Sequence, residues 1–278
     1  MTTDASSATA PLHAGPSKLG PVFAKCRAEG RAALIGYLPV GFPTVEKSIE
    51  SFETMVRAGC DIIEVGVPYS DPVMDGPTIQ EAADLALTNG VRVRDVFRAV
   101  DAITSAGGNA VVMSYWNPVL QYGVDTFARD LSAAGGAGMI TPNLIPEEGA
   151  AWHEASDEYE LDRIYLVAPS STTERIALTV DASRGFVYVA STMGVTGARD
   201  AVSDAAPELC ARVRAYSDTP LGVGLGVRNR EQASQIASYA DGVIVGSALV
   251  TAAKAGSDHL ADLVTELAAG VSEPRADL

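Results

Sequence analysis

Short apolar runs alternate with longer segments of helical period from residue 33 onward. Each run is four to seven residues long and rich in aliphatic side chains. Runs of this kind are typical of strands that are buried on both faces of a parallel sheet. They span residues 33–38, 61–67, 110–115, 138–141, 163–168, 185–190, 221–224 and 241–246. The pattern therefore predicts eight strands.

The segment after the first run has the period of an amphipathic helix. Val45, Ile49, Phe52 and Val56 recur at positions i, i+4, i+7 and i+11, which places them on one face. Gly59 follows this face and is typical of a helix end. Similar segments predict helices over about 93–103, 125–134, 147–157, 206–216, 229–239 and 258–269.

A further helix is expected after the second run. Thr78 and Glu81 have the spacing of a capping box. In this motif each side chain accepts a hydrogen bond from the backbone N–H of the other residue. Gly90 lies at the expected end of this segment. The spacing predicts a helix that begins at Thr78.

The alternation of strands and helices determines the predicted fold class. Repeated strand–helix units with apolar strands favour a parallel sheet covered by helices, in the α/β class. Eight units favour closure into a single (β/α)8 TIM barrel, here with a helical N-terminal extension. We expect the barrel to span residues 18–270, between a disordered tail over 1–17 and a flexible C-terminal tail over 271–278.

An open, doubly wound sheet is the competing architecture. The stretch GVGLGVR, residues 222–228, has glycines at alternate positions before a helical segment. A dinucleotide site would require G-x-G-x-x-G and an acidic residue at the carboxyl end of the next strand. Asp241 instead stands at the start of that strand. The barrel is therefore the favoured prediction.

Composition and charge restrict the partners of the protein. Hydrophobic residues make up 47% of the 278 residues and charged residues 20%, and the formal net charge is −15. Such a surface repels nucleic acid and anionic membranes. A small phosphorylated ligand stays possible, because backbone N–H groups at helix N-termini bind phosphate without lysine or arginine.

The cysteines and the N-terminus point to a reducing compartment. Cys26, Cys60 and Cys210 lie far apart, with no C-x-x-C pair and no histidine at ligand spacing, so neither a disulfide framework nor a zinc site is indicated. The N-terminus lacks the basic start and apolar run of a signal peptide. The longest uncharged stretch, residues 102–124, contains asparagine, proline and glutamine, which argues against a membrane span. We expect a cytoplasmic protein.

Glycine clusters end the last two runs. In a barrel of this type a phosphate often binds at the loops after the seventh and eighth strands. GLG at 224–226 and GSA at 246–248 stand at these loops, each before a helical segment. Either cluster alone could simply form a tight turn. Their joint position favours a phosphate site.

Glu64 is the unusual residue of the second run. Period two places Ile62, Glu64 and Gly66 on one face and an all-apolar set on the other, so Glu64 should point into the barrel near its carboxyl end. A buried structural glutamate needs a cationic partner, and the neighbouring strand ends supply no lysine or arginine. A catalytic carboxylate with a raised pKa is therefore favoured over a structural ion pair.

Two aspartates follow Glu64 in the loop SDPVMDGPT. Asp before Pro and Asp before Gly are common turn formers, so Asp71 is expected to have a structural or interface role. For Asp75, a turn role and a role at the substrate both stay open on these grounds. None of the histidines lies at a strand end, so none is a candidate catalyst or metal ligand; they are His13, His153 and His259.

Tyrosines stand at the ends of three other runs. Tyr37, Tyr115 and Tyr188 are expected to fill the barrel interior, and they could also line an apolar substrate cavity.

Six stretches together resemble the alpha-subunit family of tryptophan synthase. They are YLPVGFP (37–43), DIIEVGVPYSDPVMDGPTIQ (61–80), SYWNP (114–118), STMGVTGAR (191–199), GLGV (224–227) and DGVIVGSA (241–248). They occur in the family's order, and the second is highly specific. The resemblance implies a lyase that cleaves indole-3-glycerol phosphate by a retro-aldol reaction into indole and glyceraldehyde 3-phosphate.

The resemblance also implies roles for individual residues. Glu64 matches the acid/base glutamate, and Asp75 matches the carboxylate that accepts a hydrogen bond from the indole N–H. The indole pocket corresponds to Tyr37, Met113, Tyr115 and Leu225, the substrate- and loop-positioning residues to Tyr188 and Thr196, and the phosphate site to Gly197, Gly226, Gly246 and Ser247.

A partner subunit is implied by the same resemblance. Residues 71–77 and 192–206 match two mobile loops that close over the substrate and communicate with a β subunit, so Asp71 and Pro72 become candidate partner contacts. The expected assembly is an α2β2 heterotetramer. The resemblance implies no cofactor in this chain, and pyridoxal phosphate is expected in the partner β subunit.

One position departs from the family pattern. Asn143 stands where relatives usually carry Asp, which removes a charge near the mouth of the barrel. Two other functions stay open. One is a partner subunit with regulatory function and little catalysis, which retention of both carboxylates argues against. The other is a different phosphate-binding barrel enzyme, such as a sugar-phosphate epimerase, although the strand ends lack the histidines of the metal-dependent kind.

Overall fold

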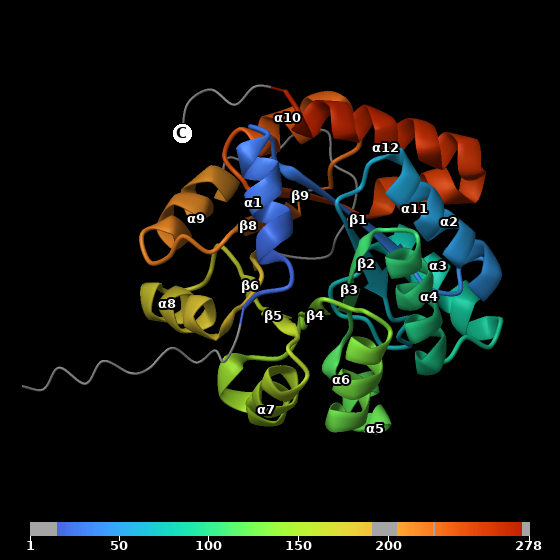
Figure 1. The fold of residues 1–278 in the computed structure, drawn as a ribbon, viewed down its shortest axis with the longest axis horizontal. Helices are drawn as coiled ribbons and strands as arrows, with labels where there is room; N and C mark the ends of the chain where they lie inside the picture. The colour runs from blue at the N-terminus through green and yellow to red at the C-terminus, as the bar shows by residue number, and fades with distance from the viewer. Residues whose placement is uncertain (1–15, 191–204, 225, 274–278) are drawn as a thin grey trace, which may run out of the picture.

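The strands form one parallel barrel in the computed structural model, which describes residues 16–190, 205–224 and 226–273 (Figure 1). The strands are β1 (Ala33–Pro39), β2 (Ile62–Gly66), β3 (Asn109–Met113), β4 (Gly138–Ile140), β5 (Asp162–Ile164), β6 (Leu166–Val167), β7 (Val187–Ala190), β8 (Leu221–Gly224) and β9 (Gly242–Val245). Each of the eight predicted runs overlaps at least one of them.

The ring closes through a strand that is divided at Tyr165. The order of the sheet is β5-β4-β3-β2-β1-β9-β8-β7-β6, and neighbouring strands are parallel. The two end strands flank Tyr165, whose carbonyl accepts a hydrogen bond of 3.0 Å from the Tyr188 N–H. The fifth predicted run, residues 163–168, thus contributes to both end strands, β5 and β6. This arrangement confirms the TIM barrel and excludes the open, doubly wound sheet.

Side chains alternate between the inside and the outside of the barrel. Ile62 of β2 belongs to an interior cluster that includes Ile35 of β1 and Val111 of β3. Ile63 and Val65 belong instead to the cluster that packs against the helices. Glu64 lies two positions after Ile62 and therefore points into the barrel, as period two predicts.

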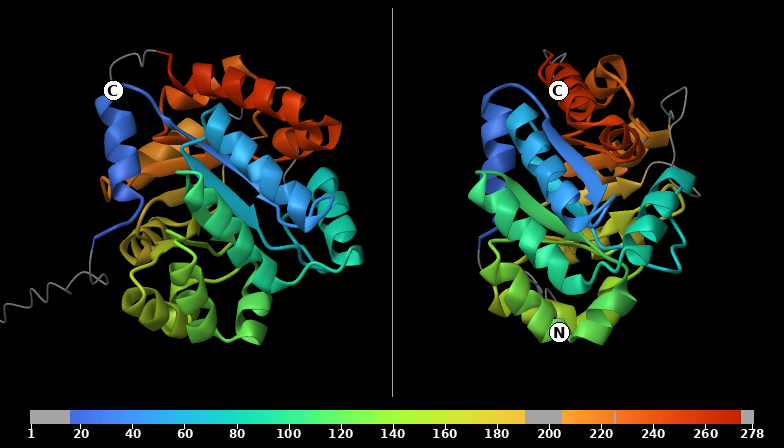
Figure 2. Two further views of the ribbon diagram at one scale, coloured as in Figure 1. Left: turned by 45° about the vertical axis from the view of Figure 1, so that its right-hand side comes forward. Right: turned by 90° about the vertical axis from the view of Figure 1, so that its right-hand side faces the viewer.

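Helices surround the barrel on its outer face (Figure 2). They are α1 (Gly20–Ala28), α2 (Val45–Ala58), α3 (Pro77–Thr88), α4 (Val93–Ser105), α5 (Trp116–Tyr122), α6 (Val124–Ala133), the 3-10 helix η1 (Pro146–Glu148), α7 (Ala150–Glu158), α8 (Thr173–Ala182), α9 (Ala205–Arg214), α10 (Arg230–Ala237), α11 (Ser247–Ala255) and α12 (Ser257–Val271). The hydrophobic pattern does not predict α5, α8 or α11 as helices.

The start and end of α2 follow the sequence closely. The Thr44 hydroxyl accepts a hydrogen bond from the Lys47 N–H at 3.2 Å and so caps the first turn. Gly59 ends the helix with a φ of 119°, a left-handed conformation that favours glycine. The predicted face and the predicted end of this helix are both confirmed.

The predicted start of α3 is wrong. Gly76 is the N-cap residue and Pro77 occupies the first helical position, so Thr78 already lies inside the helix. Proline is suited to that position because its missing N–H would have no partner in the first turn. The capping box expected between Thr78 and Glu81 is therefore not the start of the helix.

The amino end of the barrel is closed by α1. Phe23 of α1 joins the interior cluster, and its ring centroid lies 5.7 Å from that of Phe186. The Ser17 hydroxyl and the Leu19 N–H donate to the Asp162 carboxylate at 2.8 and 2.9 Å. Figure 2 shows α1 at the end of the barrel from which the strand arrows point away. Only the carboxyl end is left to receive a ligand.

Most of the two predicted tails lies outside the described residues. Helix α12 extends to Val271, one residue into the range expected for the C-terminal tail. The tails over 1–17 and 271–278 stay predictions. Among the helices of the described ranges, none is both long and apolar enough to cross a membrane.

Candidate active site

Glu64 lies inside the barrel, near the carboxyl end of β2. Only 1% of its surface is exposed, and its register partner on β1 is Tyr37. Its Oε2 atom has no hydrogen-bond partner among the described residues. A buried carboxylate oxygen without a hydrogen-bond partner destabilises the fold. A functional role for Glu64 is therefore favoured over a structural one.

Burial changes the acidity of Glu64. Loss of hydration raises the pKa of its carboxyl to about 8, and the negative charge of Asp75 contributes to the rise. The carboxyl therefore carries its proton at neutral pH. A pKa close to neutrality allows it both to donate and to accept a proton during a reaction.

Asp75 lies in the loop between β2 and α3. Burial raises the pKa of its carboxyl, and the nearby Tyr115 side chain opposes that rise. The Gln80 side-chain amide donates to the Asp75 carbonyl oxygen at 2.8 Å. The loop thus brings a second, half-buried carboxylate to the same cavity as Glu64.

Three tyrosines surround the carboxylates. Burial raises the pKa of the Tyr37 and Tyr188 hydroxyls, and the charges of Glu64 and Asp75 add to both shifts, so the four groups lie close to one another. Tyr115 belongs to the same group, because burial and the charge of Asp75 raise the pKa of its hydroxyl as well. The predicted role of these tyrosines as a lining of a substrate cavity stays a prediction.

Two glycines make room for the tyrosine rings. A Cβ atom at Gly66 would lie 2.5 Å from the ring and hydroxyl of Tyr37, and one at Gly224 would lie 2.6 Å from the Tyr188 hydroxyl. Any larger residue at either position would force the ring to move. Met113 of β3 is half-buried and packs against the interior cluster beside them.

A second group of predicted residues lies at the start of α11. Gly246 is the N-cap residue of that helix and Ser247 its first residue, and both follow β9 directly. A Cβ atom at Gly246 would have the Tyr37 ring and the Ile79 side chain as its nearest neighbours, each at 3.6 Å. The group therefore adjoins the tyrosine-lined cavity. Gly226, with a φ of 69°, lies in the loop after β8.

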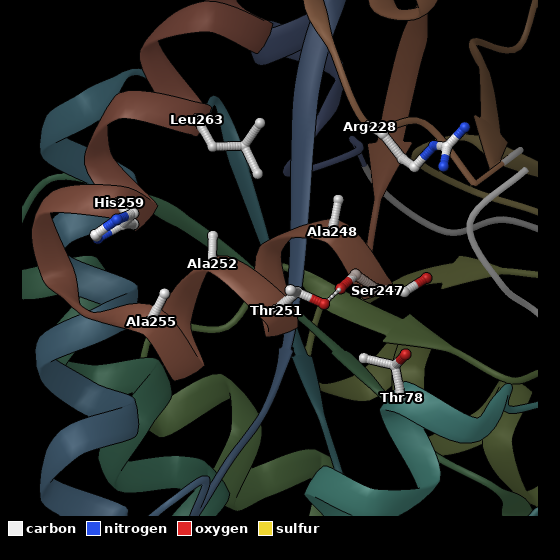
Figure 3. A pocket seen from close by; sticks show the side chains of 9 residues that line it. All are labelled: Thr78, Arg228, Ser247, Ala248, Thr251, Ala252, Ala255, His259 and Leu263. Atoms are coloured by element: carbon white, nitrogen blue, oxygen red, sulfur yellow. Dashed lines mark hydrogen bonds between the residues drawn. The ribbon is translucent and has the colours of Figure 1, made fainter. Parts of the chain in front are cut away.

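An open pocket of about 480 Å³ lies beside Ser247 (Figure 3). Its wall consists of Thr78, Arg228, Ser247, Ala248, Thr251, Ala252, Ala255, His259 and Leu263. Figure 3 shows Arg228 at one end of the pocket and His259 at the other. Neither Glu64 nor Asp75 is among the described residues that line this pocket.

Several predicted residues are not placed at the site. Thr196, Gly197 and Leu225 lie outside the described residues. Asp71 is exposed and accepts a hydrogen bond of 2.6 Å from the Ser70 hydroxyl, and Pro72 follows it on the outer part of the loop.

Sequence reasoning missed Gln80 and Tyr69. Gln80 anchors the Asp75 backbone, and the Tyr69 ring lies against Tyr115, with centroids 5.2 Å apart. Gln80 follows Asp75 by five residues, across the start of α3. This spacing is the one sequence signal that could have suggested the hydrogen bond from Gln80 to the Asp75 carbonyl oxygen.

Asn143 has a defined structural role. Its side-chain oxygen accepts a hydrogen bond of 2.9 Å from the Trp116 N–H, at the start of α5. An aspartate could accept the same bond, so the departure from the family pattern changes the charge at this helix end but not the contact.

The histidines and acidic residues form no metal site among the described residues. His153 hydrogen-bonds through Nε2 to the Tyr165 hydroxyl at 2.8 Å, and His259 lines the outer pocket.

The raised pKa of Glu64 leads to a prediction about stability. A carboxyl whose folded-state pKa, about 8, exceeds its ordinary value of 4.5 stabilises the fold below pH 4.5, and this stabilisation is lost as the pH rises through 8. The variant Glu64→Gln cannot lose a proton. Its free energy of unfolding, measured by urea titration, should exceed that of the wild type by on the order of 1–4 kcal/mol at pH 9.

The control for this measurement is Glu50→Gln, which removes an exposed carboxyl from α2. It should change the free energy of unfolding by less than about 1 kcal/mol at either pH. If the advantage of Glu64→Gln is the same at pH 5 and pH 9, Glu64 is not a carboxyl with a raised pKa.

Comparisons with known proteins identify the family of the chain. Residues 23–276 match the family model described as tryptophan synthase alpha chain. The tryptophan synthase alpha chain of Nocardia farcinica is 70% identical over 255 residues, which cover 92% of this chain and 96% of that protein. The tryptophan synthase alpha chain of Mycobacterium marinum is 68% identical over 257 residues, which also cover 92% of this chain and 96% of that protein. A solved structure of Mycobacterium tuberculosis tryptophan synthase superposes with a TM-score of 0.91 at 68% identity, covering 93% of this chain and 99% of that chain. The chain belongs to the tryptophan synthase alpha chain family.

Proposed function

We propose that Glu64 and Asp75 carry out the cleavage of indole-3-glycerol phosphate in this chain. As a tryptophan synthase alpha chain, the protein is a lyase of tryptophan biosynthesis that catalyses the alpha reaction. The observation that supports the assignment is the buried Glu64 carboxyl near Asp75, whose Oε2 atom has no hydrogen-bond partner among the described residues.

The first step is a proton transfer from Glu64 to indole C3. Because its pKa is raised to about 8, the Glu64 carboxyl holds a proton at pH 7 and can donate it. Protonation makes C3 tetrahedral and places positive charge on the ring nitrogen. Glu64 is left as a carboxylate inside a cavity that disfavours its charge, which makes it a stronger base.

The second step breaks the carbon–carbon bond. The Glu64 carboxylate removes the proton from the hydroxyl on the side-chain carbon bonded to C3. The oxygen forms a carbonyl, the electron pair of the C3–carbon bond returns to the ring, and indole and glyceraldehyde 3-phosphate separate. Glu64 has then regained its proton, so the enzyme is unchanged after one turnover.

Asp75 stabilises the positive charge that develops between the two steps. Its carboxylate would accept a hydrogen bond from the indole N–H, the position at which the ring becomes positive. A preorganised carboxylate in a partly buried site interacts strongly with such a charge, because little water screens it. The two acids thus have different tasks, Glu64 as the proton donor and Asp75 as the hydrogen-bond acceptor.

An apolar cavity would hold the indole ring. Tyr37, Met113, Tyr115 and Tyr188 would line it, and Leu225 is assigned to it by the resemblance alone. Thr196, also assigned by resemblance, would help to position the substrate and its covering loop.

The start of α11 would hold the phosphate. Gly246 and Ser247 can direct backbone N–H groups at an anion, and the helix dipole favours negative charge there. The free space beside Gly246 supports this role, because no contact within the fold requires glycine at this position. Gly226 and, by resemblance, Gly197 would complete the site.

A pyridoxal-phosphate-dependent β subunit would cover the carboxyl end of the barrel, in an α2β2 assembly. Asp71 and Pro72 are the proposed contacts. Support comes from apolar side chains exposed on the segments that follow β2, β3 and β4, namely Val73 (70% exposed), Leu120 (50%) and Ile145 (43%). Pyridoxal phosphate would belong to the partner, which acts in the cytoplasm with this chain.

Removal of either carboxyl tests the chemistry. Glu64→Gln and Asp75→Asn should each lower kcat for indole release by about two to four orders of magnitude, because each loses one proton transfer or one charge contact in the transition state. Binding of a non-cleavable indole–glycerol phosphate analogue, measured by calorimetry, should persist. Glu50→Gln is the matched control on α2, and near-normal turnover of Glu64→Gln would contradict the mechanism.

Gly246→Ala tests the phosphate site separately. The methyl group fits the ligand-free fold, so the melting temperature should stay within a few degrees of the wild type. It would occupy the space of the phosphate, so KM should rise by about 10- to 100-fold, with a smaller change in kcat. An unchanged KM would place the phosphate elsewhere.

A further inference from the structure

The side chain of Gln80 joins the first turns of α3 to the loop that carries Asp75. We infer that Gln80 is a positioning residue for the alpha reaction: its amide holds the backbone of Asp75, so that the Asp75 carboxylate stays at the cavity that contains Glu64. The inference rests on the proposed function of Asp75. In this role Gln80 acts through Asp75 and touches no reacting atom.

The Gln80 amide makes a hydrogen bond that α3 does not need for its own backbone. Its Nε2 atom donates to the Asp75 carbonyl oxygen at 2.8 Å. The backbone N–H of Gln80 donates instead to the Gly76 carbonyl at 3.0 Å, which is the ordinary bond between residues i and i−4 of a helix. The Asp75 carbonyl lies one residue before the N-cap Gly76, outside this series of backbone bonds. The side chain of Gln80 therefore supplies a donor that the helix backbone does not.

A second hydrogen bond holds the loop on the other side of Asp75. The Met74 N–H donates to the Tyr115 oxygen at 3.0 Å. Tyr115 is a firm acceptor, because only 6% of its surface is exposed and the Tyr69 ring lies against it with centroids 5.2 Å apart. The two bonds come from different elements and bracket residue 75, one at the preceding N–H and one at its own carbonyl. The backbone from which the Asp75 carboxylate extends is thus restrained on both sides.

Helix α3 gives the Gln80 amide a fixed base. The buried residues of this helix are Ile79, Ala82, Ala83 and Ala86. Ile79, the neighbour of Gln80, reaches the start of α11, where a Cβ atom at Gly246 would lie 3.6 Å from its side chain. A donor carried on a packed helix loses little freedom when it binds the loop, so the contact to Asp75 is preorganised.

The outer part of the loop gives Asp75 little support. Asp71 is exposed, and Val73 exposes 70% of its surface. Segments with few buried contacts move easily, so the bonds from Gln80 and to Tyr115 carry the restraint. A displacement of a catalytic group by about 1 Å can lower a rate by on the order of 100-fold. Loss of the Gln80 amide should therefore impair the chemical step rather than substrate binding.

Gln80→Met is the direct test, because methionine has a similar length and cannot donate a hydrogen bond. In the full chain, kcat for indole release should fall by about 5- to 50-fold, because the Asp75 carbonyl loses its donor and the carboxylate is displaced. KM should change by less than about threefold, because the proposed indole and phosphate contacts are kept. The melting temperature should stay within a few degrees of the wild type.

Gln80→Glu is the second variant, with the shape and polarity of glutamine but an ionised carboxylate in place of the donor. Its kcat should fall at least as far, because the carboxylate repels the Asp75 carbonyl oxygen. The matched control is Gln235→Met, at an exposed glutamine of α10, and its kcat and KM should equal those of the wild type. If either Gln80 variant keeps kcat within about twofold of the wild type, or only raises KM, the inference is overturned.

A double-mutant cycle separates this inference from the proposed function. In an Asp75→Ala background, Gln80→Met should lower kcat by less than about threefold, because no carboxylate is left to position. An undiminished 5- to 50-fold loss there would show that Gln80 acts independently of Asp75, which overturns the inference. If Asp75→Ala itself keeps near-normal kcat, the proposed role of Asp75 fails instead.

Discussion

The burial of a carboxyl group without a cationic partner is the constraint on which the site depends. Glu64 points into a barrel whose other interior side chains are largely apolar, and one of its oxygens meets no donor among the described residues. The fold tolerates it because the carboxyl keeps its proton, with a pKa of about 8. A pKa near neutrality is also what proton transfer at neutral pH requires. Burial of the Glu64 carboxyl therefore causes both its energetic cost to the fold and its use in catalysis.

The amino end of the barrel contains a buried carboxylate with a structural role. Asp162 is as deeply buried as Glu64, but its Oδ2 accepts hydrogen bonds from Ser17 and Leu19, and its Oδ1 lies 3.3 Å from the Arg184 guanidinium. These contacts tie α1 across the amino end of the barrel. Two buried acids on one scaffold thus differ in their partners, and that difference distinguishes the closed, structural end from the open, reactive one.

The sequence predicted the strands and the direction of Glu64 because both depend on local, period-two patterns. The starts and existence of several helices were harder to predict. Helix α11 is rich in alanine, α5 contains Pro118, and α3 begins at a proline rather than at a capping side chain, so the usual signals are weak or misleading. The hydrogen bond from the Met74 N–H to the Tyr115 oxygen links residues 41 positions apart and has no signal in one sequence. Asp75 itself was separated from Asp71 only by family resemblance, whereas the structure places Asp75 beside Tyr115 and leaves Asp71 exposed.

The decisive measurement is the titration of the Glu64 carboxyl itself. Glutamate labelled with carbon-13 at the side-chain carboxyl gives one signal per residue, and the Glu64→Gln variant identifies the signal of Glu64. In the ligand-free chain this signal should titrate with a pKa of about 8, well above the ordinary value of 4.5. A pKa close to 4.5 would show that the carboxyl is ionised at neutral pH, and it would contradict Glu64 as the acid that protonates indole C3.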